Sequence, residues 1–550
     1  MPKPITTNTL FYGDNLPILR EHIADESVDL IYLDPPFNSN RSYNVLFKDG
    51  SGAEADAQIE AFDDTWHWGE SAERTYKELV ENSPERVGAM IGALRQFIGA
   101  NQMMAYLVMM AARLVELHRV LKPTGSLYLH CDPTASHYLK IVLDTIFDPQ
   151  NFRNEILWRR YGTHNDVGQG SRHFGRVHDI LLFYTKTDTP SWNQVFTPLN
   201  PEYVKETYRH VDPVTKRLFT TTPLTGPGGA EKGNPVYDWK GHTRAWRYNK
   251  ETMEKLDREG KLYYSNTGYV RQKLYLDESK GVPVQDVWDD IPSLSGAHAE
   301  RLGYPTQKPL ALLERIVAAS SNEDDIVLDP FCGCGTAIAA AQKLGRKWIG
   351  IDITHLSIAL QKHRLKDMFD LKPGKDYQVV GEPVSIGGAQ QLAKDSRYQF
   401  QFWALSLVQA RPLGGVEGSK QGKKGSDRGI DGVITFIDDP REKPKRALIQ
   451  VKSGHVKSGD VRDLRGTVER EDAAAGIFIT LEPATRDMEK EAITAGSYHS
   501  PLVKRDFPKI QILTVEELLN GAEPKLPIVR GTFKQAERVK DAEARQKKLL

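Results

Sequence analysis

The chain has 550 residues, enough for three or four domains of roughly 150 residues each, or for one large catalytic domain with additions. Hydrophobic residues at 39% and charged residues at 27% are typical of a globular chain and exclude a disordered or fibrous one. The 73 Lys and Arg residues balance the 73 Asp and Glu residues, so net charge favours neither nucleic acid nor membrane as a partner, and any basic surface must be local.

No segment predicts membrane insertion or secretion. The longest uncharged apolar stretch, residues 103–112, is too short to span a bilayer, and the N-terminus (MPKPITTNTL) has no apolar signal-peptide segment. The 3 cysteines cannot build a disulfide framework, and no second Cys/His pair accompanies Cys332 and Cys334 to suggest zinc. We therefore expect a cytoplasmic protein without a membrane partner.

Apolar runs alternate with helical patterns over residues 1–150. Residues 28–33 predict a buried strand, which the two prolines of the following DPPF sequence (34–37) end. Helix-spaced apolar residues over 84–121 predict helix, and residues 126–130 predict the next strand. Strands separated by helices predict an α/β fold with a doubly wound parallel sheet.

Residues 151–300 differ in composition from the segments before and after them. They are rich in aromatic residues, and the part between Pro201 and Tyr275 has a modest excess of Lys and Arg over Asp and Glu. Cations bind phosphates and aromatic faces stack on bases, so this mixture suits a DNA-facing insertion. A mixed domain whose aromatic residues form its own core is an equally open alternative.

The α/β pattern returns after residue 300. Residues 325–329 predict a strand, the loop DPFCGCGT (329–336) leads into a helix, and residues 348–352 predict another strand. The glycines let the loop backbone approach a ligand, and Asp352 ends the next strand, where a carboxylate can accept hydrogen bonds from ribose hydroxyls. The dinucleotide fingerprint needs a third glycine where Ile338 stands. The loop therefore predicts a nucleoside cofactor without a pyrophosphate, and a loop without ligand is the weaker alternative.

The DPPF sequence ends a strand at the edge where open α/β sheets place their chemistry. A carboxylate and a backbone carbonyl can accept both hydrogens of an exocyclic amine, and Phe37 offers a face for stacking. These are the requirements for holding a flipped-out base whose amine attacks a methyl group. Alone, DPPF could be a turn after a strand; its pairing with the glycine loop favours the functional reading.

These motifs together resemble the β class of S-adenosylmethionine-dependent amino DNA methyltransferases, the circularly permuted group in which the catalytic motif precedes the cofactor motif. The resemblance covers residues 8–370 apart from the variable middle. It is carried by GDNL (13–16), DPPF (34–37), YPTQKPL (304–310), LDPFCGCGT (328–336) and IGID (349–352).

The resemblance implies a Rossmann-like fold, double-stranded DNA as partner and S-adenosylmethionine as cofactor. It implies that catalysis depends on four adjacent residues, namely Asp34, Pro35, Pro36 and Phe37, with Asp34 and the Pro35 carbonyl on the amine and Phe37 on the base. It implies that the cofactor is bound by Asp14, Thr306, Lys308, Asp329, Phe331, Gly333, Gly335, Thr336 and Asp352. By resemblance alone we also expect a homodimer.

The target base follows less firmly. Cytosine-N4 relatives more often have Ser where Asp34 stands, which favours N6 of adenine and leaves N4 of cytosine open. Methylation of cytosine C5 is excluded by chemistry, because it needs a cysteine nucleophile, usually after proline, whereas Cys131, Cys332 and Cys334 follow His, Phe and Gly. An RNA methyltransferase is a third, weaker alternative, since the amine chemistry is shared.

The C-terminal part carries a second constellation. Asp431 precedes one predicted strand and Gln450 and Lys452 lie on the next, where alternation turns both to one face. A carboxylate and a carbonyl oxygen can hold Mg²⁺, and the lysine can orient water beside a phosphate. The pattern resembles the PD-(D/E)xK nucleases, in particular Mrr-like restriction endonucleases, and implies Asp431, Gln450 and Lys452 as catalytic residues, with Asp431 and Gln450 as metal ligands.

This second resemblance has a departure. The first helix offers only glutamines (Gln399 and Gln401) where an acid often completes the metal site, so Asp427 or Glu417 would have to help. Two readings follow: a restriction–modification enzyme that methylates a specific site and cuts unmethylated DNA with Mg²⁺, or a methyltransferase alone, whose nuclease-like domain only binds DNA.

The motifs divide the chain into six parts. They are a catalytic methyltransferase part (1–150), a target-recognition insert (151–300), a cofactor-binding part (301–371), a linker (372–396), a nuclease-type domain (397–520) and a basic tail (521–550).

Overall fold

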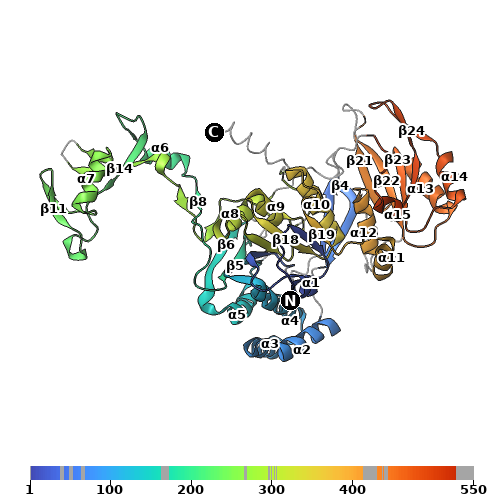
Figure 1. Cartoon of the computed structure of the whole chain (residues 1–550), viewed down its shortest axis with the longest axis horizontal. Coiled ribbons are helices and arrows are strands. Elements are labelled where there is room, and N and C mark those ends of the chain that lie inside the picture. The colour runs from blue at the N-terminus through green and yellow to red at the C-terminus, as the bar shows by residue number, and fades with distance from the viewer. Residues whose placement is uncertain are drawn as a thin grey trace. The chain divides into compact units, whose positions relative to one another are not determined.

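A nine-stranded sheet organises the larger of two units in this computed structural model (Figure 1). The larger unit comprises Met1–Asn193 and Asp286–Leu550, and the smaller unit comprises Gln194–Gln285. The structure describes residues 2–36, 68–162, 172–265, 269–294, 298, 300–302, 304, 306–412, 430–436, 438 and 444–527, and the backbone of 42–48 and 54–63.

The sheet is parallel except around one strand. Its order is β16 (Val287–Trp288), β6 (Phe152–Arg159), β7 (His178–Thr185), β5 (Leu121–Cys131), β2 (Val28–Leu33), β17 (Ile326–Asp329), β18 (Lys347–Asp352), β1 (Thr9–Tyr12) and β19 (Gln378–Val380). Only β7 runs antiparallel to its neighbours, β6 and β5. The predicted doubly wound α/β fold is confirmed. Strands β6, β7 and β16 come from the segment 151–300, while the compact smaller unit spans only 194–285.

Helices cover both faces of this sheet (Figure 1). One layer contains α1 (Asn15–His22), α4 (Gln102–Val120) and α5 (Ser136–Phe147), with α2 (Glu70–Asn82) and α3 (Glu85–Ile98) packed on α4. The other layer contains α8 (Leu310–Ser320), α9 (Thr336–Lys343) and α10 (His355–Phe369). All six residues of β2 are buried between the layers, as its mainly apolar sequence predicts for a central parallel strand, and its one charged residue, Asp29, pairs with Lys122.

The helical pattern over 84–121 forms two helices, not one. Gly99 ends α3 with a φ of 76°, a backbone conformation that glycine adopts without steric cost. Asn101 then begins α4, because its side chain accepts a hydrogen bond from the backbone N–H of Met104. The break lets α4 lie against the sheet while α3 packs outside it, which apolar spacing alone does not reveal.

Two strands that are far apart in sequence lie side by side at the centre of the sheet. Strand β2 pairs in parallel with β17, with Leu30 opposite Val327 and Ile31 opposite Leu328. The carboxyl ends of parallel neighbours meet at one edge of the sheet. The residues that follow these strands, Asp34 and Pro330, are therefore brought to the same place.

The smaller unit has its own sheet and core. The antiparallel sheet has the strand order β13 (Leu262–Tyr264), β14 (Val270–Tyr275), β10 (Leu218–Pro223) and β9 (His210–Val211). The unit also contains two separate strand pairs, β11 (Val236–Trp239)–β12 (His242–Ala245) and β8 (Phe196–Thr197)–β15 (Val282–Pro283). Its helices are α6 (Pro201–Thr207) and α7 (Lys250–Arg258). Trp246 is 1% exposed and Trp239 is 6% exposed in its core. Some aromatic residues of this unit therefore pack in its core, as expected from the alternative in which the insertion is a mixed domain with an aromatic core. Lys240 lies over the ring of Tyr264, 4.5 Å from its centroid.

The C-terminal part contains a second α/β sheet. Its order is β20 (Arg411–Pro412), β21 (Gly432–Phe436), β22 (Lys445–Lys452), β23 (Ala475–Thr480) and β26 (Ile510–Thr514). Around it lie α11 (Ile386–Asp395), α12 (Arg397–Leu407), α13 (Ser458–Arg470), α14 (Arg486–Thr494), α15 (Val515–Leu519) and the hairpin β24 (Ser497–Ser500)–β25 (Arg505–Pro508). One more hairpin, β3 (Ser42–Lys48)–β4 (Glu54–Asp63), precedes α2. None of the helices within the described residues is both long and apolar enough to cross a membrane.

Candidate active site

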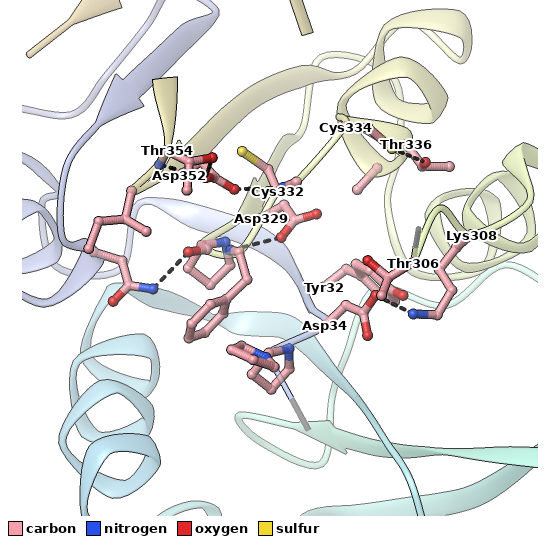
Figure 2. A pocket seen from close by; sticks show the side chains of 18 of the residues that line it. Tyr32, Asp34, Thr306, Lys308, Asp329, Cys332, Cys334, Thr336, Asp352 and Thr354 are labelled. Atoms are coloured by element: carbon pink, nitrogen blue, oxygen red, sulfur yellow. Dashed lines mark hydrogen bonds and ion pairs between the residues drawn. The ribbon is translucent and has the colours of Figure 1, made fainter. Parts of the chain in front are cut away.

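A pocket of about 210 Å³ lies at the carboxyl ends of β1, β2, β17 and β18. Figure 2 shows Asp34 facing Lys308, with Tyr32 and Thr306 beside them and Asp352 at the other end of the pocket. The sequence-predicted residues that line it are Asp14, Asp34, Pro35, Pro36, Thr306, Lys308, Asp329, Phe331, Gly333, Thr336 and Asp352. Gly335 is not on the pocket wall, and Phe37 lies outside the described residues.

The glycine loop is shaped by two left-handed residues, Gly333 with a φ of 47° and Gly335 with a φ of 75°. Gln361 of α10 donates a hydrogen bond from Nε2 to the Gly333 carbonyl at 2.8 Å. A Cβ at position 335 would lie 2.7 Å from Gln361 Cγ, so the loop approaches α10 too closely for a side chain there. Gly335 therefore acts on the pocket by setting the course of the loop.

Asp352 is tied to the same loop. Its Oδ2 accepts from the Gly333 N–H at 2.9 Å, and its Oδ1 accepts from both the N–H and the hydroxyl of Thr354, each at 2.9 Å. Burial raises the pKa of Asp352, although these hydrogen bonds act in the opposite direction. Asp352 thus braces the loop, and a second lone pair on Oδ2 leaves an acceptor for a ribose hydroxyl.

Asp34 forms an ion pair with Lys308, whose Nζ donates to Asp34 Oδ2. The side chains are 18% and 11% exposed, so the pair faces the pocket but is largely shielded from solvent. Gln307 holds this segment, because it donates to the Glu300 carbonyl at 2.8 Å and accepts from the Leu302 N–H at 2.7 Å. Sequence reasoning assigned Lys308 to the cofactor, which stays a prediction; the structure shows it paired with the carboxylate of the DPPF motif.

Asp329 closes the floor of the pocket. It is 3% exposed and accepts a hydrogen bond from the Phe331 N–H at 3.0 Å. Burial raises the pKa of Asp329 well above its ordinary value, and the nearby Asp34 and Asp352 act in the same direction. Because its charged form is disfavoured, Asp329 is better suited to hydrogen bonding within the pocket than to presenting a free negative charge.

Sequence reasoning missed Arg113 on α4. Its Nη2 donates to Asp14 Oδ1 at 2.7 Å, and its Nε donates to Asn15 Oδ1. Asn15 in turn donates to the Pro330 carbonyl at 2.7 Å, which joins the first motif of the chain to the glycine loop. The available signal was its position, since Arg113 is the first charge after the apolar stretch 103–112.

In the C-terminal sheet, Asp431 lies beside β22, the strand that carries Gln450 and Lys452. The Asp431 N–H donates to the Ile449 carbonyl at 2.8 Å, and its Oδ2 accepts from the Val451 N–H at 2.6 Å. Gln450 is 7% exposed, and its Oε1 has no hydrogen-bond partner among the described residues. The candidate ligands Asp427 and Glu417 lie outside the described residues.

No Mg²⁺ site follows from these contacts. The described part of the chain contains no group of three or more His, Cys, Asp or Glu residues that could hold a metal ion. Asp431, Gln450 and Lys452 together supply a single carboxylate, and one of its oxygens is already used by the neighbouring strand. The metal and nuclease roles of these three residues therefore stay predictions.

Comparison with known proteins places the pocket in a family context. A family described as DNA methylase (N6_N4_Mtase) matches residues 28–361. The chain is 30% identical over 353 residues to the type II methyltransferase M.EcaI of Enterobacter cloacae, covering 63% of this chain and 67% of that protein. It is 26% identical over 358 residues to the type III restriction-modification enzyme StyLTI Mod subunit of Salmonella typhimurium, covering 62% of this chain but only 50% of that protein.

Two further matches bear on the finer predictions. The chain is 26% identical over 366 residues to the DNA adenine methyltransferase YhdJ of Escherichia coli, covering 65% of this chain and 82% of that protein. Residues 416–520 match a family described as NACHT-associated inactive restriction endonuclease 1. This second match covers the segment that contains Asp431, Gln450 and Lys452.

Proposed function

This chain belongs to the DNA methylase family, and we propose that it transfers a methyl group from S-adenosylmethionine to an exocyclic amine of a specific site in double-stranded DNA, with N6 of adenine favoured. The observation that carries the proposal is the meeting of Asp34, Pro35 and the glycine loop in one pocket. Asp at position 34 and the likeness to a DNA adenine methyltransferase support the adenine assignment.

The pocket fits the donor. The left-handed Gly333 has a Tyr304 ring atom 3.3 Å from where its Cβ would be, so only a bare backbone leaves this space open. Phe331, Met109 and Ile353 give the pocket apolar walls, and Asp352 offers an acceptor at one end. S-adenosylmethionine supplies an electrophilic methyl group when it is bound there.

The residues at the end of β2 act on the amine. Asp34 and the Pro35 carbonyl accept its two hydrogens and so direct the nitrogen lone pair toward the methyl carbon. Lys308 fixes the Asp34 carboxylate from the opposite side. No covalent enzyme intermediate is needed, because the amine is itself the nucleophile, and the three thiols Cys131, Cys332 and Cys334 are all buried.

The product of the reaction tests this proposal. Purified protein is incubated with long amplified DNA, which carries no methylation, and with S-adenosylmethionine labelled at its methyl group; the nucleosides are then analysed by mass spectrometry. We expect label in N6-methyladenine. Label in N4-methylcytosine would overturn the adenine assignment alone, and unlabelled DNA would overturn the proposed function.

For the C-terminal sheet we infer a role in binding DNA without cutting it. The matched family is described as an inactive restriction endonuclease, and the Asp431, Gln450 and Lys452 set offers only one carboxylate for a divalent cation. Lys452 and the backbone around it remain suited to phosphate contacts. This is the second of the two readings that the sequence leaves open.

A cleavage assay distinguishes the readings. We expect long unmethylated DNA to stay intact with Mg²⁺ in the presence and absence of S-adenosylmethionine, while binding of the protein to that DNA weakens steeply as salt is raised. Discrete fragments from unmethylated DNA, with DNA premethylated by the same protein spared, would contradict this role. That result would establish the restriction–modification reading and make Asp431 and Lys452 catalytic.

A further inference from the structure

A buried chain of polar side chains runs from the pocket into the sheet. The Tyr32 hydroxyl is hydrogen-bonded to His130 Nδ1 at 3.0 Å, and His130 Nε2 lies 3.2 Å from Asp179 Oδ2. Arg160 ends the chain, with its Nε 3.2 Å from Asp179 Oδ1. Tyr32 lines the pocket beside Asp34 (Figure 2), whereas His130 and Asp179 are 0% and 1% exposed.

The sheet order explains why these residues meet. Strands β2, β5 and β7 are consecutive neighbours, so Tyr32, His130 and Asp179 reach one another across three strands. Burying polar groups such as these costs free energy unless their hydrogen bonds are satisfied. Apolar side chains would fill the same space without that cost, so packing alone does not explain the imidazole and the carboxylate. The proposed binding of the amine and of the cofactor involves none of these side chains, so their burial needs a separate explanation.

The hydrogen bonds define which tautomer a neutral His130 adopts. A carboxylate cannot donate, so Asp179 Oδ2 accepts an Nε2–H, and in a neutral ring Nδ1 is then unprotonated. That Nδ1 accepts from the Tyr32 hydroxyl. The arrangement of carboxylate, imidazole and hydroxyl is the one in which a histidine takes a proton through a hydroxyl and is stabilised as an imidazolium by the carboxylate.

Charged groups on the surrounding elements support this arrangement. Burial raises the pKa of Tyr32 well above its ordinary value, and the carboxylates of Asp34, Asp329 and Asp179 act in the same direction, so the hydroxyl keeps a proton. Burial acts against ionisation of Asp179, but the His130 hydrogen bond and the charges of Lys308 and Arg160 leave its pKa lowered. Asp179 is thus held as a carboxylate.

We propose that Tyr32, His130 and Asp179 form a proton-transfer chain that removes the proton released by methylation of the amine, an inference that rests on the methyl-transfer function proposed above. The amine nitrogen bonds to the methyl carbon as the carbon–sulfur bond breaks and its electron pair stays on sulfur. As this bond forms the nitrogen becomes acidic, and its proton is released in the same transition state. Through a pocket water this proton passes to the Tyr32 oxygen while the Tyr32 proton moves to His130 Nδ1.

The proton then rests on His130 as an imidazolium beside Asp179. When the product leaves, the same path returns the proton to water in the opened pocket. Tyr32 never exists as a tyrosinate in this scheme, because one proton enters as the other leaves. His130 and Asp179 act through Tyr32 and do not touch the substrate.

Tyr128 provides a matched control for Tyr32. The two residues are directly paired on neighbouring strands and are equally buried, each 2% exposed, but the Tyr128 hydroxyl bonds to Ser320 Oγ at 2.7 Å and does not line this pocket. Tyr32→Phe and Tyr128→Phe therefore each remove one buried hydroxyl and one hydrogen bond. Only Tyr32→Phe interrupts the proposed chain.

The experiment measures single-turnover methyl transfer to a duplex that carries one site mapped with the wild-type protein. We expect Tyr32→Phe to slow transfer about 30-fold, less than the range of about 10² to 10⁴ typical of a directly acting base, and Tyr128→Phe to stay within about twofold of wild type. The wild type and Tyr128→Phe should show a solvent deuterium isotope effect that Tyr32→Phe lacks. Equal losses in both variants, or an unchanged rate in Tyr32→Phe, would overturn the chain.

His130→Gln separates proton transfer from positioning. The glutamine oxygen can still accept a hydrogen bond from Tyr32 but cannot take up a proton. Transfer as slow as in Tyr32→Phe, without the isotope effect, is expected; wild-type rate in His130→Gln would leave only a positioning role and overturn the proposal. If the wild-type protein methylates no DNA, the proposed function itself fails, an outcome distinct from any of these.

Discussion

Replacing Asp34 with alanine is expected to lower the rate of methyl transfer by about 10³-fold or more, because two effects act together. The amine loses the acceptor that orients its lone pair. In addition, the variant loses the negative charge that is paired with Lys308 beside a nitrogen that becomes positive in the transition state. Single-turnover transfer of a labelled methyl group to DNA measures the loss.

Binding of the cofactor provides the internal check on this prediction. Asp34 lies at the end of the pocket opposite Asp352 (Figure 2), so the calorimetric Kd for S-adenosylmethionine should stay within about twofold of wild type. Glu314→Ala is the matched control, since Glu314 also pairs with a lysine, Lys343 at 2.7 Å, but away from the pocket. Near-normal transfer by Asp34→Ala would remove Asp34 from the reaction, and an equal loss in Glu314→Ala would point to general damage.

The central strands could be predicted because their signal is local. Residues 28–33 predicted β2 with the observed bounds, and the predicted strands 325–329 and 348–352 differ from β17 and β18 by one residue at their starts. Each is a short, mainly apolar run that ends at a proline, a glycine loop or an acid, so periodicity and turn chemistry agree. The motifs that follow these runs line one pocket because the carboxyl ends of neighbouring parallel strands lie at one edge of the sheet.

What could not be predicted depends on register and on contacts through space. His130 was known only as the end of a predicted strand, and its contact with Tyr32 requires β5 to lie next to β2 in one particular register. Arg113 reaches Asp14 only because α4 packs beside α1. Chain position marks Arg113 as a charge at the end of an apolar stretch, but it does not reveal which residues Arg113, His130 or Tyr32 contact.

Gly335→Val is expected to weaken binding of S-adenosylmethionine about 100-fold, which corresponds to about 3 kcal/mol. A branched side chain is strained at a φ of 75°, and its Cβ would lie 2.7 Å from Gln361 Cγ. Gln361 cannot yield easily, because it is 1% exposed and its Nε2 is bonded to the Gly333 carbonyl. The strain is therefore relieved by displacement of the loop itself, which isothermal titration calorimetry detects as a higher Kd.

Gly374→Val separates the effect of the close contact with Gln361 from the effect of placing valine in a left-handed backbone conformation. Gly374 has a φ of 78°, nearly that of Gly335, but nothing lies within 4 Å of where its Cβ would be, and the residue is remote from the pocket. Both variants share the cost of a left-handed valine, about 1 to 2 kcal/mol of stability, so both should melt earlier than wild type. If Gly374→Val raises the Kd as much as Gly335→Val, lost stability explains the effect; if only Gly335→Val does, the close approach of the loop to α10 shapes the cofactor site.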